Sequence, residues 1–171
     1  MNTLKHYLEE AMLHELSVVQ HLMAKLPESA WDFRPRENMR STVELLQYLS
    51  YISETSLGAY VKGGWLPENI PPMRALRDEK LKLTREDFHN AIEEQKIKIR
   101  EILAPISDAD LYSQKTLHPW GTEVLLLEAI LNATLKYLAA YKMQLFLYAK
   151  MNGAELVTLN AWKGIDPPQK P

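Results

Sequence analysis

The stretch TEVLLLEAILNATLKYLAAYKMQLFLYAKMNG, residues 122–153, predicts one long helix and sets the class of fold. It contains the most apolar window of the chain, and Gly153 suits the left-handed position that commonly follows a helix. Glu128, Lys136 and Lys142 interrupt that window, whereas a membrane span needs ~20 mostly apolar residues. We therefore predict a helix over 122–152 that packs in a protein core.

Two further segments at the amino-terminal end carry helical patterns. Residues 3–25 repeat apolar side chains at three- and four-residue steps and stop before Pro27, because proline disfavours helical geometry in the residue preceding it. The next helix begins at Ser41 or Thr42, where Ser41 and Glu44 have the spacing of a capping box. It is expected to end near the glycine pair at 63–64.

A third pattern follows in the second half of the chain. Thr84 and Asp87 suit an amino-terminal cap, and apolar residues then recur until Pro105. Residues 107–111 are expected to form one short helical turn, and the segments 28–40, 65–83, 112–121 and 154–171 are expected to be irregular connections or ends.

These patterns predict the architecture. Four long helices without strand alternation indicate an all-α four-helix bundle with long connections. We expect a single domain over 1–166 and a loose Pro-rich tail over 167–171.

Composition narrows the functional classes. The net charge is −2, so no global field favours nucleic acid or an anionic membrane, and we expect neither as a partner. The chain has no cysteine, which excludes disulfides, cysteine–metal sites and a protein thiol nucleophile. The first residues, 1–6, lack the features of a secretory signal, and the expected location is cytoplasmic.

Three tyrosines mark a candidate pocket. Tyr137 and Tyr141 are four residues apart, so they lie on one face of the last helix. Tyr48 lies on the second helix. Thr134, Gln144 and Tyr148 continue the face of the last helix, and Glu44 precedes Tyr48 by one turn. His118, in the loop before Trp120, is the histidine placed to act as a proton carrier at the pocket mouth.

The motifs around these tyrosines resemble those of the DinB family. The segment NMRSTVELLQYL (38–49) is similar to the family's Ser-x-x-Glu-Leu-x-x-His-Leu pattern, and YLAAYKMQL (137–145) is similar to its His-x-x-x-His-Arg-Gly-Gln segment. The resemblance implies a four-helix bundle, a homodimer, and a divalent metal held by three histidines. The corresponding positions here are Tyr48, Tyr137 and Tyr141, and Gln144 is retained.

A phenol is a poor substitute for imidazole at such a site. Its pKa near 10 means that it must lose a proton before it becomes a strong donor, whereas neutral imidazole binds metal at neutral pH. The sequence therefore predicts a protein without a metal or other cofactor. A ferric site with phenolate ligands is the chemical alternative, since hard ions prefer oxygen.

Three interpretations of the tyrosines follow. They could line a polar aromatic pocket for a small organic ligand, comprising Tyr48, Tyr137, Tyr141, Gln144, Glu44, Tyr148 and His118. They could fill the former cavity as satisfied core, in a structural or interaction protein. The resemblance implies a third interpretation, a thiol-dependent transferase or other metal-dependent enzyme with altered ligands.

A metal site on the first helix, away from the three tyrosines, is a further candidate. Glu10, His14 and His21 lie near one face of the first helix, but His14 and His21 are ~10 Å apart along its axis, too far to share one ion comfortably.

Overall fold

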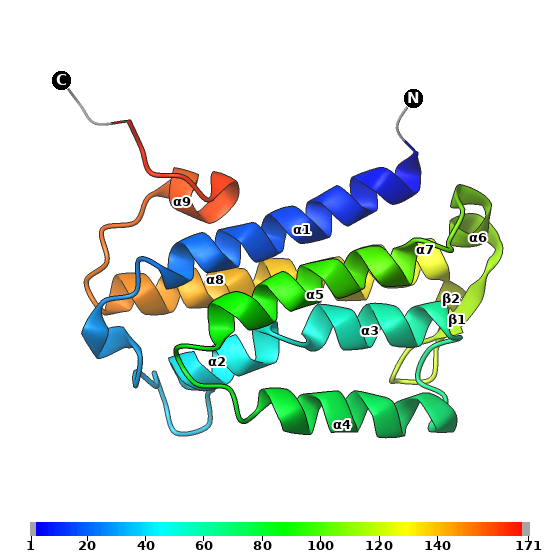
Figure 1. Ribbon diagram of the computed structural model, residues 1–171, viewed down its shortest axis with the longest axis horizontal. Helices are drawn as coiled ribbons and strands as arrows, with labels where there is room; N and C mark the ends of the chain where they lie inside the picture. The colour runs from blue at the N-terminus through cyan, green and yellow to red at the C-terminus, as the bar shows by residue number, and fades with distance from the viewer. Residues whose placement is uncertain (1–2, 169–171) are drawn as a thin grey trace.

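The structure is a computed structural model that describes residues 3–168. Four long helical segments lie side by side and form a bundle (Figure 1). They are α1 (Leu4–Met23), the broken pair α2 (Thr42–Leu49) and α3 (Ile52–Val61), α5 (Phe88–Leu103), and the composite of α7 (Leu126–Ala129), the π-helical turn η3 (Ile130–Leu135) and α8 (Lys136–Met151). The predicted all-α bundle is confirmed.

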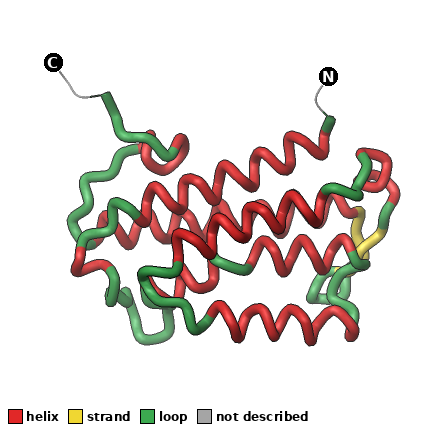
Figure 2. The backbone as a smooth tube through the Cα atoms, in the orientation of Figure 1, coloured by secondary structure: helices red, strands yellow, loops and turns green. Residues whose placement is uncertain are grey.

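Shorter helices and two strands lie in the connections between the long helices and after the last of them (Figure 2). They are η1 (Glu28–Ala30), η2 (Pro67–Asn69), α4 (Ile70–Lys80), α6 (Asp108–Ser113), β1 (Lys115–Leu117), β2 (Glu123–Leu125) and α9 (Thr158–Lys163). Helix α4 runs along the outside of α2 and α3, and α9 lies against α1 (Figure 1). The carboxyl end of the predicted tail, 169–171, lies outside the described residues.

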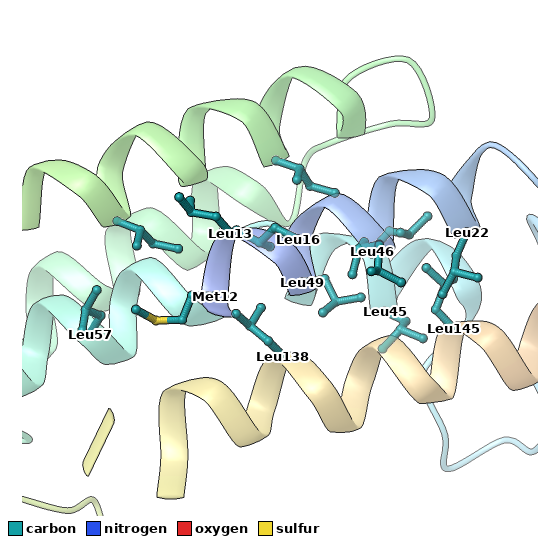
Figure 3. Close-up of a cluster of buried hydrophobic side chains, with 14 of the residues drawn as sticks. Met12, Leu13, Leu16, Leu22, Leu45, Leu46, Leu49, Leu57, Leu138 and Leu145 are labelled. Atoms are coloured by element: carbon teal, nitrogen blue, oxygen red, sulfur yellow. The ribbon is translucent and has the colours of Figure 1, made fainter. Parts of the chain in front are cut away.

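The core is a continuous layer of aliphatic side chains between the long helices. Leu16 from α1, Leu46 and Leu49 from α2, and Leu138 and Leu145 from α8 are fully buried and point toward one another (Figure 3). Burying one such side chain contributes about 1.5–3 kcal/mol, so these residues dominate the stability of the bundle. The three- and four-residue apolar spacing of α1 therefore produces the buried face that it predicts.

Two predicted helix ends are confirmed in detail. The Ser41 hydroxyl accepts a hydrogen bond from the Glu44 N–H (3.2 Å), and the Glu44 carboxylate accepts one from the Ser41 N–H (2.8 Å), which completes the capping box. Gly153 has a φ of 92° just after α8, as the pattern indicates.

The second helix differs from its prediction. It breaks between α2 and α3, where Tyr51 has φ −138° and ψ −19°, and restarts at Ile52. No glycine or proline marks the break. The Ser50 hydroxyl donates to the Leu46 carbonyl (2.8 Å), a side-chain bond that competes locally with the helical ladder.

Other segments predicted as irregular carry regular structure. The 65–83 crossover contains α4, whose two prolines at 71–72 lie in its first turn, where a missing N–H costs nothing. The 154–171 segment contains α9. The 112–121 loop begins with the end of α6 and β1, and the last helix starts at Leu126 because residues 123–125 form β2 of an antiparallel hairpin. These strands are too short for alternation to reveal them.

The hairpin touches the bundle at one glycine. Gly64, with φ 99°, bridges Leu117, and a Cβ on Gly64 would lie 2.1 Å from the Leu117 carbonyl oxygen. Only glycine therefore allows this contact. The contact fixes the hairpin against the end of α3 and so places His118, the next residue after β1, beside Tyr60.

We predict that Gly64→Ala is markedly more destabilising than Gly121→Ala. Gly121 also has positive φ (87°), but a Cβ there meets nothing within 4 Å. Gly121→Ala should cost about 1–3 kcal/mol from backbone strain alone. Gly64→Ala should cost a further ~1–3 kcal/mol, because the backbone of β1 must move. Urea denaturation of both variants measures the difference, and equal losses would contradict the close approach.

Candidate functional site

The rings of Tyr48 and Tyr141 pack against each other between α2 and α8. Their centroids are 4.6 Å apart at an interplanar angle of 63°, and Tyr51 meets the other side of Tyr48 at 5.4 Å. Tyr48 and Tyr141 are half-buried. Edge-to-face pairs of this kind contribute about 0.5–1.5 kcal/mol beyond their burial. The space between α2 and α8 is thus occupied by phenol rings.

Tyr137 lies one helical turn before Tyr141 and is the neighbour of both Tyr141 and Tyr60. Burial raises the pKa of Tyr137, and the neighbouring phenol of Tyr141 adds to the rise. Burial also raises the pKa of Tyr60, on α3, with the phenol of Tyr137 contributing. The phenols therefore form a row that crosses from α2 through α8 to α3.

Arg40 places a positive charge on this row. Its guanidinium carbon lies 4.1 Å from the ring centroid of Tyr48 and 5.3 Å from that of Tyr141. A cation over an aromatic face is attracted to the ring quadrupole. The Tyr148 hydroxyl donates to the Arg40 carbonyl (3.0 Å), and the Gln144 amide donates to the Tyr148 hydroxyl. Gln144 and Tyr148 thus hold the backbone of Arg40 in place.

Glu44 is committed to structural contacts. Besides its cap, it binds the Arg34 guanidinium at 2.7 Å, and Arg34 also donates to the Met39 carbonyl. The hydrogen bond from Arg34 lowers the pKa of Glu44, and the Ser41 N–H lowers it further. Glu44 and Gln144 border a polar hollow together with Arg34 and Arg40.

His118 lies at the hairpin end of the phenol row. It is 5% exposed, its Nδ1 is 2.8 Å from the Tyr60 hydroxyl, and its ring stacks on Trp120 at 4.4 Å. Burial lowers the pKa of His118, which favours the neutral imidazole. His118 contacts Tyr60, and Tyr60 in turn neighbours Tyr137 on α8.

A divalent metal does not fit the residues present. Burial raises the pKa values of Tyr48 and Tyr137 above 10, so both phenols are protonated at neutral pH and are weak donors. The guanidinium of Arg40 already lies over Tyr48 and Tyr141 and would repel a second cation.

The histidines of α1 make separate contacts. His14 Nε2 is 2.7 Å from the Trp162 carbonyl oxygen, and His21 Nε2 is 3.0 Å from the Asn160 amide nitrogen. Within residues 3–168, no three His, Cys, Asp or Glu side chains form a group that could hold a metal ion. The displaced site at Glu10, His14 and His21 is therefore not assembled.

Open space lies on the outer side of Tyr48, beneath α4. A pocket of about 330 Å³ is lined by aromatic and aliphatic side chains and by two arginines: Tyr48, Tyr51, Ile52, Thr55, Trp65, Ile70, Met73, Arg74 and Arg77. Of these residues, only Tyr48 is predicted from the sequence to belong to a pocket. The three-residue step from Tyr48 to Tyr51 was a readable signal, but Trp65 and the two arginines needed knowledge that 70–80 is a helix crossing α2.

Two solved structures are similar to this bundle over nearly the whole chain. A candidate member of the DinB family from Exiguobacterium sibiricum 255-15 matches with a TM-score of 0.70, covering 94% of this chain and 99% of its own, at 17% identity. This chain has the DinB-like fold. The DinB-like protein YjoA of Bacillus subtilis matches with a TM-score of 0.65 over 92% of this chain and 97% of its own, also at 17% identity. No family model and no curated protein matches the sequence.

The resemblance seen in the motifs is thus confirmed for the fold. In this DinB-like bundle the second and fourth helical segments bring Tyr48 and Tyr141 into contact, as the motif positions imply. The described part of the chain, 3–168, contains no helix long and apolar enough to cross a membrane.

The buried phenols should ionise late. Burial raises the pKa values of four of the eight tyrosines, namely Tyr48, Tyr51, Tyr60 and Tyr137. A pKa raised in the folded state contributes stability that is present below pH 10 and is lost as pH rises through the folded value. Absorbance at 295 nm should therefore show these four ionising only above pH 10, together with loss of helical circular dichroism. Complete ionisation at pH 10 in a folded protein would refute this.

Arg40 should control whether a metal site can be restored. Replacing Tyr48, Tyr137 and Tyr141 together by His supplies three imidazoles, but Arg40 leaves a positive charge beside them. Adding Arg40→Ala should tighten zinc or nickel binding at least ~10-fold, the effect of about 1.4 kcal/mol of repulsion removed. Arg36→Ala, at an exposed arginine of the same loop, is the control. Calorimetry measures both. Failure of the folded quadruple variant to bind either ion would show that the side chains do not converge.

Proposed function

We propose that this protein binds a small organic acid with a flat apolar body in the pocket between α2–α3 and α4. The observation that carries the proposal is the composition of that pocket, in which aromatic rings and two guanidinium groups surround about 330 Å³. Ligand sites commonly have such a volume, a mostly apolar lining and a few convergent polar groups.

Aromatic walls favour a flat ligand. Tyr48 and Tyr51 lie edge to face on one side, and Trp65 contributes its indole from the segment after α3. Trp65 is itself fixed, because its ring packs on Tyr60 at 4.9 Å and its backbone N–H donates to the Leu117 carbonyl (3.0 Å). A rigid aromatic surface can bind a planar ligand with little loss of conformational entropy in its own side chains.

The arginines favour a carboxylate. Arg77 donates to Asp78 through Nε and Nη2, at 2.9 and 2.7 Å, and this pair is exposed. Arg74, one turn earlier on α4, has no carboxylate within 4 Å among residues 3–168. A guanidinium presents a planar fork that matches a carboxylate with two parallel hydrogen bonds. Arg74 is therefore the residue that selects for the anion.

A structural role is the second candidate. It is favoured by the contact between Tyr48 and Tyr141, because these rings fill the space between α2 and α8 that the resemblance would assign to a metal. This interpretation concerns the inner side of Tyr48, whereas the ligand proposal concerns its outer side. The homodimer that the resemblance implies is likewise a proposal.

Benzoate and benzamide separate these functions. The two probes share a ring but differ in charge, so benzoate should shift the NMR signal of the Trp65 indole N–H and benzamide should do so more weakly. Arg74→Gln should weaken benzoate binding at least ~10-fold, since a hydrogen bond to a charged group contributes about 1.5–3 kcal/mol. Arg36→Gln, in the 34–40 loop, is the matched control and should change nothing. Equal shifts with both probes, or equal effects of both variants, would contradict the proposal.

A further inference from the structure

A second and larger cavity lies on the other side of Met73 from the aromatic pocket. It has a volume of about 490 Å³ and is bounded by α3, α4 and α5. Thr55 and Met73 border both spaces, so they form the wall between them. Most of the lining is apolar, with Val61, Leu76 and Ile102 among its members.

Gly58 borders this cavity and puts no side chain into it. It lies in the middle of α3, where glycine is about 0.5–1 kcal/mol less stable than alanine. A Cβ at this position would lie 3.6 Å from Ile102 Cδ1, which is an ordinary contact. The backbone thus tolerates a side chain, and the larger part of any such side chain would occupy the cavity.

Glu54 brings a carboxylate to the same cavity, one helical turn before Gly58. It is half-buried, and among residues 3–168 it has no ion-pair partner within 4 Å. Burial raises the pKa of Glu54, and the charges of Lys80 and Lys98 only partly oppose this effect.

The lysines near Glu54 are bound to other carboxylates. Lys80 contacts Glu79 and Glu94, each at 3.2 Å, and Lys98 contacts Glu101 at 2.6 Å. A buried or half-buried charge is normally paired, because desolvation is costly without a partner. Of the charged side chains that line the cavity, Lys62, Lys98 and Glu101 are exposed, and Glu54 is the half-buried one without an ion-pair partner within 4 Å among residues 3–168.

We propose that the cavity between α3, α4 and α5 binds an organic cation, a protonated amine on an apolar body, with the ammonium at Glu54 and the body beside Gly58. An ammonium would supply the missing charge partner and the hydrogen-bond donors for the carboxylate. An anion would meet the repulsion of the half-buried Glu54, whereas Lys98 is already paired with Glu101 and the charge of the exposed Lys62 is screened by solvent. The inference is independent of the organic acid proposed for the aromatic pocket.

Benzylammonium tests the proposal against two probes with the same ring, benzyl alcohol and benzoate. Benzylammonium should shift the amide NMR signals of Gly58 and Ala59, whereas benzyl alcohol should bind at least tenfold more weakly and benzoate should not shift them. Equal binding of benzylammonium and benzyl alcohol would overturn the role of Glu54. No shift with benzylammonium up to solubility would overturn the site.

Paired variants localise the effect. Glu54→Gln preserves shape and should weaken benzylammonium binding at least tenfold, while Glu155→Gln, at an exposed carboxylate that does not line the cavity, should leave it unchanged. Gly58→Leu should abolish binding by filling the cavity, and Gly58→Ala should retain most of it. Equal binding by Gly58→Leu and Gly58→Ala, or by the two glutamate variants, would overturn the proposal.

The two pockets are distinguished by the same variants. Gly58→Leu should leave benzoate binding at Trp65 unchanged, and Arg74→Gln should leave benzylammonium binding unchanged. A loss of both ligands in Gly58→Leu would place them in one site and would contradict the independent cavity.

Discussion

The guanidinium of Arg40 lies over the rings of Tyr48 and Tyr141, and the organisation of the candidate site depends on this contact. It joins the loop before α2 to α2 and α8 at once. Because Tyr148 holds the Arg40 carbonyl, the position of the charge is set by the backbone as well as by the side chain. The phenol rings fill the space between α2 and α8, and the guanidinium already provides a positive charge there, so no metal ion is required to join the two helices. The pocket that borders Tyr48 therefore lies on the outer side of this ring, where α4 crosses the bundle.

Helix α4 forms a common wall of two spaces but buries little of itself. Lys80 is its only buried residue, and Met73 and Leu76 are only half-buried. Each half-buried side chain contributes less than the ~1.5–3 kcal/mol of a fully buried one. Helix α4 is therefore held more weakly than α1 or α8. Elements with few buried apolar contacts are where local opening costs least, which suits a helix that covers the two proposed ligand sites.

The bundle was readable in the sequence because its signals are local. The spacing of Leu8, Met12 and Leu16 and the Ser41–Glu44 pair each act within a few residues. The break at Tyr51 was not readable, since no glycine or proline marks it. The hairpin depends on Gly64 meeting Leu117, a contact between residues far apart in the chain. The candidate site divides in the same way: Tyr137 and Tyr141 share a face by helical spacing, whereas the roles of Arg40 and Arg74 arise only from tertiary packing.

The π-helical turn at Ile130–Leu135 determines how the fourth helical segment responds to the loss of one residue. Such a turn accommodates one residue more than an α-helical turn would, and it lies between the half carrying Leu126 and the half carrying Tyr141. Each residue of an α-helix advances the chain by about 100° of rotation, since a turn holds 3.6 residues. Deleting a single residue within regular α8 would therefore rotate one half by roughly that angle, whereas the same deletion within the π turn would leave an α-helical turn and keep Leu126 and Tyr141 in their present relative orientation. The π turn is therefore the position in this buried helix where the chain can shorten by one residue without turning either half away from its partners.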